Sequence, residues 1–252
     1  MTRTLLGWVC GIVLLITVWW LVSLGINDRS LLPTPYSILA IITREFEALF
    51  SITVRTAVNA LLGLTLAMFA AILLVVLVGA FPKAEVLVYP YIVMLKATPA
   101  VAFAPLLVVL IGSGPWVKIV VAALIAFFPA VIGGIDGIKR TPERLLVISD
   151  AYGCSRWTEF RHVVCGFAIA GFFSGMKTSA PLAVVGAIVG EFVDATAAGK
   201  SGIGLYIASH ARYVYMDQVF AGVVMATTLG LTFFITVAVF SHYVDRRLRL
   251  ER

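Results

Sequence analysis

Charged residues are scarce in this chain of 252 residues, where Asp, Glu, Lys and Arg together make up only 13%. Soluble domains carry about 25% charged residues, so this low value excludes an ordinary soluble enzyme or binding module. The hydrophobic fraction is instead 61%, and the mean hydropathy is +1.04. Most side chains must therefore face lipid or other apolar helices, and the sequence predicts a membrane protein with little room for a soluble domain.

Cysteine and histidine are also scarce. The three cysteines, Cys10, Cys154 and Cys165, have no metal-ligand spacing, and the three histidines are far apart in the sequence. There are no paired catalytic carboxylates and no arrangement of Ser, His and Asp that would suit nucleophilic catalysis. The sequence therefore predicts no catalytic residue, no metal site and no cofactor bound by this chain.

Long apolar runs are the main feature that the sequence does contain. A transmembrane helix needs roughly 20 mostly apolar residues, and runs of this kind follow one another with short loops between them. We expect an all-α polytopic membrane protein with about six transmembrane helices. The expected spans cover residues 7–26, 52–79, 86–111, 116–135, 167–189 and 219–243.

These spans divide the chain into three parts. Residues 1–50 are expected to form an N-terminal transmembrane helix and a periplasmic interfacial helix, because apolar residues recur on one helical face between Tyr36 and Phe50. Residues 51–245 are expected to form a core of five transmembrane helices, and residues 246–252 a basic cytoplasmic tail.

The net charge of +6 would also suit a nucleic-acid partner, but the positions of the basic residues favour a membrane explanation. Basic residues collect on the cytoplasmic side of membrane proteins. With six spans both termini lie on one side, and assigning this side to the cytoplasm places eleven Lys and Arg residues there and six outside. We therefore expect cytoplasmic termini, surrounding membrane lipid and no nucleic-acid partner.

Proline is concentrated in the third span, which contains Pro90, Pro99 and Pro105. Proline removes a backbone donor and bends or breaks a helix. Lipid tolerates this only where protein or a water-filled cavity satisfies the freed carbonyl groups. We therefore expect this span to face the interior of the bundle.

Small residues four apart occur twice in the fifth span, at Gly171 and Gly175 and at Gly186 and Gly190. Such pairs let two membrane helices approach closely. They predict a structural role in helix packing.

Residues 136–166 interrupt the apolar pattern with ten Asp, Glu, Lys, Arg and His residues. Within this segment Trp157, Phe160 and Val164 recur at helical spacing. A short helix from Ser155 onward would therefore have one apolar and one charged face. Such a helix suits contact with another protein or with the membrane interface.

The sequence of this loop resembles a known family. From Gly137 it reads GIKRTPERLL, and from Asp150 it reads DAYGCSRWTEFR. This segment resembles the cytoplasmic coupling loop, or EAA loop, of binding-protein-dependent ABC transporter permeases. The likeness extends over most of the chain and is closest to the nitrate, sulfonate and taurine branch. Further matching stretches are LLPTP from Leu31, ATPAVAFAPLL from Ala97, AFFP from Ala126, GEF from Gly190 and GIGLY from Gly202.

The resemblance implies a type I importer permease fold, with a cytoplasmic coupling helix between spans four and five in the loop 137–166. In the family this loop docks onto a separate ATP-binding subunit. The glycine would let the chain turn between two short helices, Trp157 and Phe160 would fill a pocket, and arginines would fix the register. The residues assigned to coupling are Asp150, Ala151, Gly153, Ser155, Arg156, Trp157, Phe160 and Arg161.

By the same resemblance, the chain is a permease subunit of an ATP-driven importer in the bacterial inner membrane, and it is not an enzyme. The expected partners are two ATP-binding subunits that hold ATP and Mg, a second permease subunit that completes a homodimer, and a periplasmic substrate-binding protein. Specificity in such importers comes largely from the binding protein. A small organic or inorganic anion and a vitamin precursor therefore both remain open as substrates.

The loop departs from the family pattern at both ends. The family's acidic residue falls on Val147, and its proline falls on Gly166. Asp150 and Glu143 are the candidate substitutes for the missing acid.

Charged residues inside spans are candidates for the substrate pathway. A charge within a span costs about 3 kcal/mol on insertion scales, so Lys96 and Lys177 either line a polar interior or reach an interface. Glu191, at the end of the fifth span, suits either a gate or a helix cap. The predicted pathway or gate group consists of Lys96, Pro99, Phe103, Pro105, Lys177 and Glu191.

An alternative function is secondary transport driven by an ion gradient. Such a transporter would show inverted repeats and acidic residues at mid-membrane. The sequence contains neither feature, so the importer subunit is the preferred interpretation.

Overall fold

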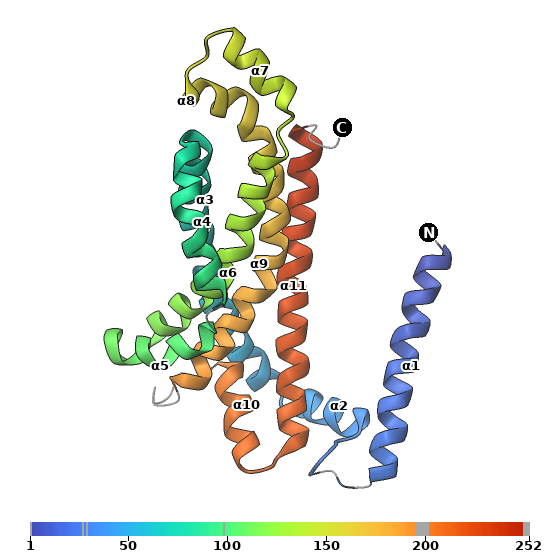
Figure 1. Ribbon diagram of the computed structural model, residues 1–252. Coiled ribbons are helices and arrows are strands. Elements are labelled where there is room, and N and C mark those ends of the chain that lie inside the picture. Colours follow the sequence, from blue (N-terminus) through green and yellow to red (C-terminus); the bar gives the residue numbers. More distant parts are fainter. Residues whose placement is uncertain (1, 27, 29, 98, 195–201, 249–252) are drawn as a thin grey trace.

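The computed structural model describes residues 2–26, 28, 30–97, 99–194 and 202–248, and every secondary-structure element in these ranges is a helix (Figure 1). The all-α polytopic fold expected from the sequence is confirmed. The elements in chain order are α1 (Thr2–Ile26), α2 (Pro35–Arg44), α3 (Phe46–Ala80), α4 (Pro82–Ala97), α5 (Ala100–Ile111), α6 (Pro115–Lys139), α7 (Glu143–Ala151), α8 (Arg156–Glu159), the π-helical turn η1 (Phe160–Val164), α9 (Cys165–Val193), α10 (Ile203–Arg212) and α11 (Met216–Leu248).

The core of the bundle consists of α3, α6 and α9. Helices α6 and α9 run antiparallel and pack along most of their length, while α3 lies against both (Figure 1). Many of the buried side chains between them are small, such as those of Ala126, Ala130 and Ala180. Small side chains bring helix backbones close together, which is how helices associate in lipid.

Glycines set the closest approach between α6 and α9. A Cβ atom on Gly171 would overlap the carbonyl oxygen of Gly133. Farther along α9, a Cβ atom on Gly186 would lie 2.6 Å from the Cα atom of Ala122, which is too short for a carbon–carbon contact. The glycines four residues on in each pair approach α6 in the same way. The close packing predicted from the two glycine pairs is confirmed, with α6 as the partner helix in both cases.

Four helices in the described chain are long and apolar enough to cross a membrane. They are α3, α6, the continuous helix Arg156–Val193, and α11 as far as Val244. These helices correspond to the second, fourth, fifth and sixth expected spans. The first expected span corresponds to α1, of which Val13–Ile26 forms a shorter apolar stretch.

The third expected span is not one helix, and in this respect the prediction was wrong. Helix α4 ends at Ala97 and α5 begins at Ala100, with Pro99 in an extended conformation (φ −61°, ψ 109°) before α5. Proline has no N–H group and disfavours a helical conformation of the residue before it, so the helix is interrupted here. Pro90 and Pro105 lie inside α4 and α5. The expected break by proline therefore occurs at Pro99.

The expected interfacial helix over residues 36–50 is also divided. Helix α2 ends at Arg44, and Glu45 (φ −109°, ψ 22°) separates it from α3. Ile38 and Leu49 are nevertheless buried in one apolar cluster, so the apolar spacing continues across the junction although the helix does not. Residues 46–50 belong to the long core helix α3.

Helix α1 stands beside the bundle in Figure 1 and is joined to it near one end. The ring centroids of Trp19 and of Phe220 on α11 are 5.6 Å apart. The Ser23 hydroxyl donates a hydrogen bond to the Leu32 carbonyl oxygen (2.9 Å). Most of the described side chains of α1 are exposed, so this helix contributes little to the core.

Candidate functional site

The charged loop folds into a helical hairpin made of α7, a glycine turn and α8 (Figure 1). Gly153 has φ +66°, a conformation that costs a residue with a Cβ atom. The Cys154 N–H donates to the Ser149 carbonyl (3.0 Å) and the Gly153 N–H to the Asp150 carbonyl (2.9 Å). These two bonds form a Schellman motif that ends α7. The turn between two short helices has the geometry for which a glycine was expected.

Helix α8 begins directly after this turn. The Ser155 hydroxyl accepts a hydrogen bond from the Thr158 N–H (3.3 Å) and caps the helix. Arg156 forms an ion pair with Glu159 across one helical turn (3.2 Å). The chain then continues through η1 into α9, so that residues 156–193 form one helical path of 38 residues. The hairpin is therefore attached directly to the most central helix of the core.

Large apolar side chains are exposed on this hairpin. Tyr152 is 84% exposed and Trp157 is 55% exposed. Val147, at the position of the family's acidic residue, and its neighbour Ile148 are also exposed. We name these four residues the tip surface. The other expected coupling residues are exposed around it, apart from Phe160: Asp150, Ala151, Gly153, Ser155, Arg156 and Arg161.

Phe160 points into the chain itself. Its side chain is 5% exposed and packs with Ala80 and Val164. A Cβ atom on Gly79 would overlap the Phe160 ring, so the glycine makes room for it. Sequence reasoning placed Phe160 beside Trp157 on a surface that fills a partner's pocket. In the structure, Phe160 instead fixes the start of η1 to the end of α3.

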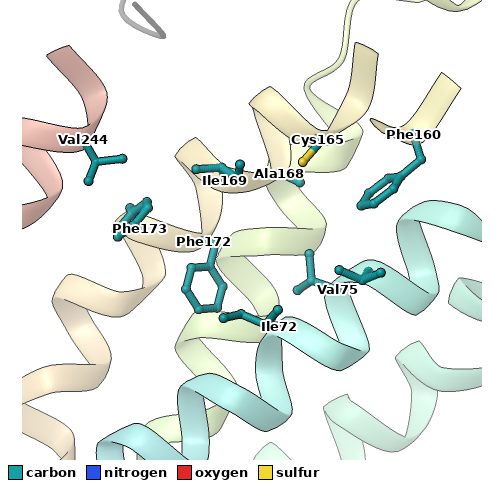
Figure 2. Close-up of a pocket in the computed structure, with 10 residues that line it drawn as sticks. Ile72, Val75, Phe160, Cys165, Ala168, Ile169, Phe172, Phe173 and Val244 are labelled. Atoms are coloured by element: carbon teal, nitrogen blue, oxygen red, sulfur yellow. The ribbon is translucent and has the colours of Figure 1, made fainter. Parts of the chain in front are cut away.

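An apolar hollow of 420 Å³ lies beside Phe160, between α3, α9 and α11 (Figure 2). Figure 2 shows Phe160 and Val75 on one side of the hollow and Phe173 and Val244 on the other. Every residue of its lining is apolar or a cysteine, so it carries no group that would orient a polar substrate.

Glu191 lies at the opposite end of α9 from the hairpin and is 1% exposed. Its carboxylate accepts hydrogen bonds from the Thr56 hydroxyl on α3 (2.8 Å) and from the Gly204 N–H in the first turn of α10 (2.8 Å). The Thr56 oxygen in turn accepts a bond from the Ile203 N–H (2.9 Å). The sequence suited either a gate or a helix cap at Glu191, and these contacts are those of a helix cap. The capped helix is α10, whereas Glu191 itself belongs to α9.

A buried ion pair that sequence reasoning missed lies next to this group. The Lys118 ammonium on α6 is 3.4 Å from the Asp194 carboxylate, and the two side chains are 7% and 0% exposed. Asp194 also accepts a bond from the Gly114 N–H (3.1 Å). A lysine in the first turn of an apolar helix was the available signal, because such a charge needs a buried partner.

Of the other predicted pathway residues, Pro99, Phe103 and Pro105 lie at the start of α5 or within it, and Lys177 lies in α9. Lys177 is half-buried midway along α9, and Phe103 is half-buried on α5, which packs against the start of α6. Pro99 and Pro105 are exposed. The Lys96 side chain lies outside the described residues. Within the described part of the chain, no three His, Cys, Asp or Glu residues are grouped so as to hold a metal ion.

These observations define a class of protein: a multi-pass helical membrane domain with a glycine-packed core and a protruding helical hairpin. The chain belongs to the family of binding-protein-dependent transport system inner membrane components, which it matches over residues 63–250. The matched region runs from the middle of α3 to the end of α11 and includes the hairpin.

Named transport proteins are similar to this chain over most of its length. The formylaminopyrimidine transport permease protein ThiX of Halalkalibacterium halodurans is 27% identical over 89% of this chain and 88% of its own. SsuC of Bacillus subtilis, whose name assigns it to aliphatic sulfonates transport, is 26% identical over 89% of this chain and 82% of its own. The riboflavin transport system permease protein RibX of Chloroflexus aurantiacus is 31% identical over 63% of this chain and 56% of its own.

The chain is therefore a permease subunit of an ABC importer and a transport component, not an enzyme. Membership of this family implies a partner ATPase and a substrate-binding protein.

Proposed function

We propose that the tip surface of the α7–α8 hairpin is where the ATP-binding subunit docks, with ATP and Mg held by that subunit. Two copies of this chain form a homodimer around the substrate pathway, each with one ATP-binding subunit, and a periplasmic binding protein delivers the substrate. The complex lies in the bacterial inner membrane with both termini of this chain in the cytoplasm.

The exposure of the tip surface is the observation that carries this proposal. Tyr152 and Trp157 are more than half exposed on a hairpin that extends beyond the end of α3 (Figure 1). Tyrosine and tryptophan contribute much of the binding energy at protein interfaces, and a loop that faced only water would gain nothing from exposing them.

The charges of the same segment support its cytoplasmic position. Exposed basic residues cluster on and beside the hairpin, as expected for the cytoplasmic side of a membrane protein. They are Lys139, Arg140, Arg144, Arg156 and Arg161.

The helical path from α8 to α9 supplies a route for coupling. When the two ATP-binding subunits close on ATP, they move the hairpins that they hold. Because α8, η1 and α9 are continuous, this movement displaces α9 and with it the glycine-packed helix α6. The π-helical turn lies where Phe160 meets α3, and such turns are frequent at functional sites.

The test compares Trp157, in α8 of the hairpin, with Trp116, at the end of α6 that lies away from the hairpin. Trp157→Ala removes an aromatic side chain from the tip surface, and Trp116→Ala removes one that is 68% exposed at the other end. Each variant is purified, mixed with the ATP-binding subunit and reconstituted with the binding protein. We expect Trp157→Ala to weaken ATPase binding about tenfold or more, as loss of an interface tryptophan does. We expect Trp116→Ala to bind normally.

Two results would overturn the proposal. One is binding of the ATPase and normal coupled hydrolysis by Trp157→Ala. The other is uptake by reconstituted vesicles that runs on an ion gradient without ATP, which would instead support secondary transport.

For the substrate, we propose a small organic or inorganic anion or a vitamin precursor. The names of the relatives support this range, since they refer to formylaminopyrimidine, aliphatic sulfonates and riboflavin. Lys177, half-buried in the middle of α9, would favour an anion if it faces the pathway. A binding screen of such compounds against the cognate binding protein tests the range, and binding of sugars or cationic peptides alone would contradict it.

A further inference from the structure

The segment that begins α10 is held by polar contacts to two core helices. Glu191 on α9 and Thr56 on α3 are 1% and 0% exposed. Between them they accept hydrogen bonds from the first two N–H groups of α10, those of Gly204 and Ile203. The N–H groups of a first helical turn have no partners within the helix, so these side chains take the place of a cap. We name Thr56, Glu191 and residues 202–204 the clasp.

Two glycines make the clasp possible. A Cβ atom on Gly202 would overlap the Glu191 and Thr56 oxygens that form it. A Cβ atom on Gly204 would lie 2.8 Å from the Ile188 carbonyl oxygen and 2.9 Å from a Glu191 oxygen. The GEF and GIG stretches, which are separate in the sequence, therefore meet in one contact.

The start of α10 has no such polar contact with α11 among the hydrogen bonds described; the two helices are joined at the other end of α10 by residues 213–215, where the Tyr215 N–H donates to the His210 carbonyl (3.0 Å), and otherwise pack through apolar side chains. A Cβ atom on Gly222 of α11 would lie 2.6 Å from the Ile207 side chain, and Ala221 and Phe220 share its apolar cluster. Apolar contacts have no direction and tolerate sliding, whereas hydrogen bonds in a dry interior fix both distance and angle. A further bond joins α10 to the core, from the Tyr206 hydroxyl to Glu45 at the start of α3 (3.1 Å).

We propose that Thr56 and Glu191 are positioning residues for transport: the clasp makes the start of α10 move with α3 and α9. Movement that enters at the hairpin and passes along α9 then reaches α10 at the far end of the membrane domain. This inference rests on the proposed docking of the ATPase at the tip surface. The inference predicts that α10, at the end of the membrane domain away from the hairpin, moves when the nucleotide bound to the ATP-binding subunits changes.

The test separates coupling from folding. Thr56→Val keeps the shape of the side chain and removes the hydroxyl, whereas Thr56→Ser keeps the hydroxyl and is the matched control. Glu191→Gln gives a second variant that keeps the size of the side chain and weakens its acceptors. All are made in a chain in which Cys10, Cys154 and Cys165 are replaced, and each is assembled with the ATP-binding subunits and the binding protein.

The first readout is uptake per ATP hydrolysed. Losing one buried hydrogen-bonding group shifts a two-state equilibrium about tenfold, so we expect Thr56→Val and Glu191→Gln to lower this ratio by about that factor. ATP hydrolysis itself continues, because the tip surface is intact. Thr56→Ser retains the normal ratio.

The second readout is thiol labelling at the exposed end of α10, with Arg212→Cys as the reporter. In the otherwise unaltered complex, the labelling rate by an impermeant maleimide changes between the nucleotide-free state and the state trapped with ATP and vanadate. In Thr56→Val and Glu191→Gln this difference is lost. A clasp that served only stability would lower the yield of folded protein and leave the nucleotide-dependent difference unchanged.

The outcomes distinguish this inference from the function on which it rests. If Trp157→Ala uncouples the complex while Thr56→Val and Glu191→Gln behave like Thr56→Ser, the clasp has no role in coupling and the inference is wrong. If Trp157→Ala has no effect, the docking proposal itself is wrong. If Thr56→Val does not assemble, Glu191→Gln decides by the same two readouts.

Discussion

The ring of Phe160 lies so close to Gly79 that no side chain larger than a hydrogen atom fits between them. This contact joins the first residue of η1 to the next-to-last residue of α3. It places the base of the hairpin on the core, while the tip surface stays exposed. The hairpin therefore has a buried base and an exposed tip, which is the arrangement that a docking element requires.

Replacing Phe160 at this base should loosen the hairpin. Truncating a buried phenylalanine costs about 3 kcal/mol, because apolar contacts are lost and a cavity remains. We expect Phe160→Ala to lower the unfolding temperature of the purified protein and to reduce coupled ATP hydrolysis. Phe81→Ala is the control, since Phe81 is 62% exposed in the same region. Equal unfolding temperatures for the two variants would contradict the anchoring role.

The effect of a substitution at Gly153 should depend on how readily the new residue adopts a positive φ. Proline fixes φ at about −65°, far from the observed +66°, so Gly153→Pro should abolish ATPase docking while membrane insertion continues. Gly153→Ala should cost about 1 kcal/mol, because a Cβ atom disfavours the left-handed region. Gly153→Asn should come closest to the wild type, since asparagine tolerates this conformation. Measuring how tightly the ATPase binds to each membrane-inserted variant tests this ranking of Asn, Ala and Pro. Normal docking by Gly153→Pro would refute the prediction.

Much of the fold followed from length and hydropathy alone. Apolar runs of membrane-spanning length predicted α3, α6, α9 and α11, because a span in lipid must satisfy its backbone groups within the helix. The glycine pairs predicted close packing, and the loop glycine predicted a turn. The third expected span is two helices because Pro99 interrupts it, whereas Pro90 and Pro105 lie inside α4 and α5, and the sequence alone does not distinguish these three prolines.

The contacts between distant segments could not be predicted in the same way. An amphipathic pattern shows that Phe160 and Trp157 share a helical face, but not that α3 covers one and leaves the other exposed. Glu191 was singled out as an acid at the end of a span. Its partner Thr56 is 135 residues away in the sequence, and no local pattern around either residue predicts that the two are in contact.

The approach of α6 and α9 should not tolerate a larger side chain. A Cβ atom on Gly175 would overlap the carbonyl oxygen of Pro129, and neither helix can move without disturbing the rest of their interface. We expect Gly175→Val to abolish recovery of a monodisperse protein from detergent. Gly25→Val on α1 is the matched control, because no atom from another part of the described chain lies within 4 Å of the added Cβ there. Normal recovery of both variants would show that the crossing can relax.

The ion pair between Lys118 and Asp194 should behave as a coupled unit. Leaving one buried charge without its partner costs about 3 kcal/mol, whereas replacing both charges together is often nearly neutral. We expect Lys118→Met and Asp194→Asn each to lower the unfolding temperature and the double variant to recover part of the loss. The coupling is read from a double-mutant cycle by chemical denaturation in detergent. Additive effects would mean that the 3.4 Å contact contributes no interaction energy.

Tyr206 should make the stability of the protein depend on pH in the alkaline range. Burial raises the pKa of its hydroxyl above the ordinary value of 10.0, and the charge of Glu45 and the hydrogen bond to it raise the pKa further. Above that ordinary pKa the unfolded chain releases the proton while the folded chain keeps it, so stability falls as the pH rises. We expect the unfolding temperature of the wild type to decline from about pH 10 upward, and Tyr206→Phe to remove this part of the decline.

Glu45→Gln should lower the pKa of Tyr206 only partly, because burial remains. A titration of tyrosinate absorbance, taken as the difference between wild type and Tyr206→Phe, measures this pKa directly, and ionisation near pH 10 would contradict the burial of the hydroxyl beside Glu45.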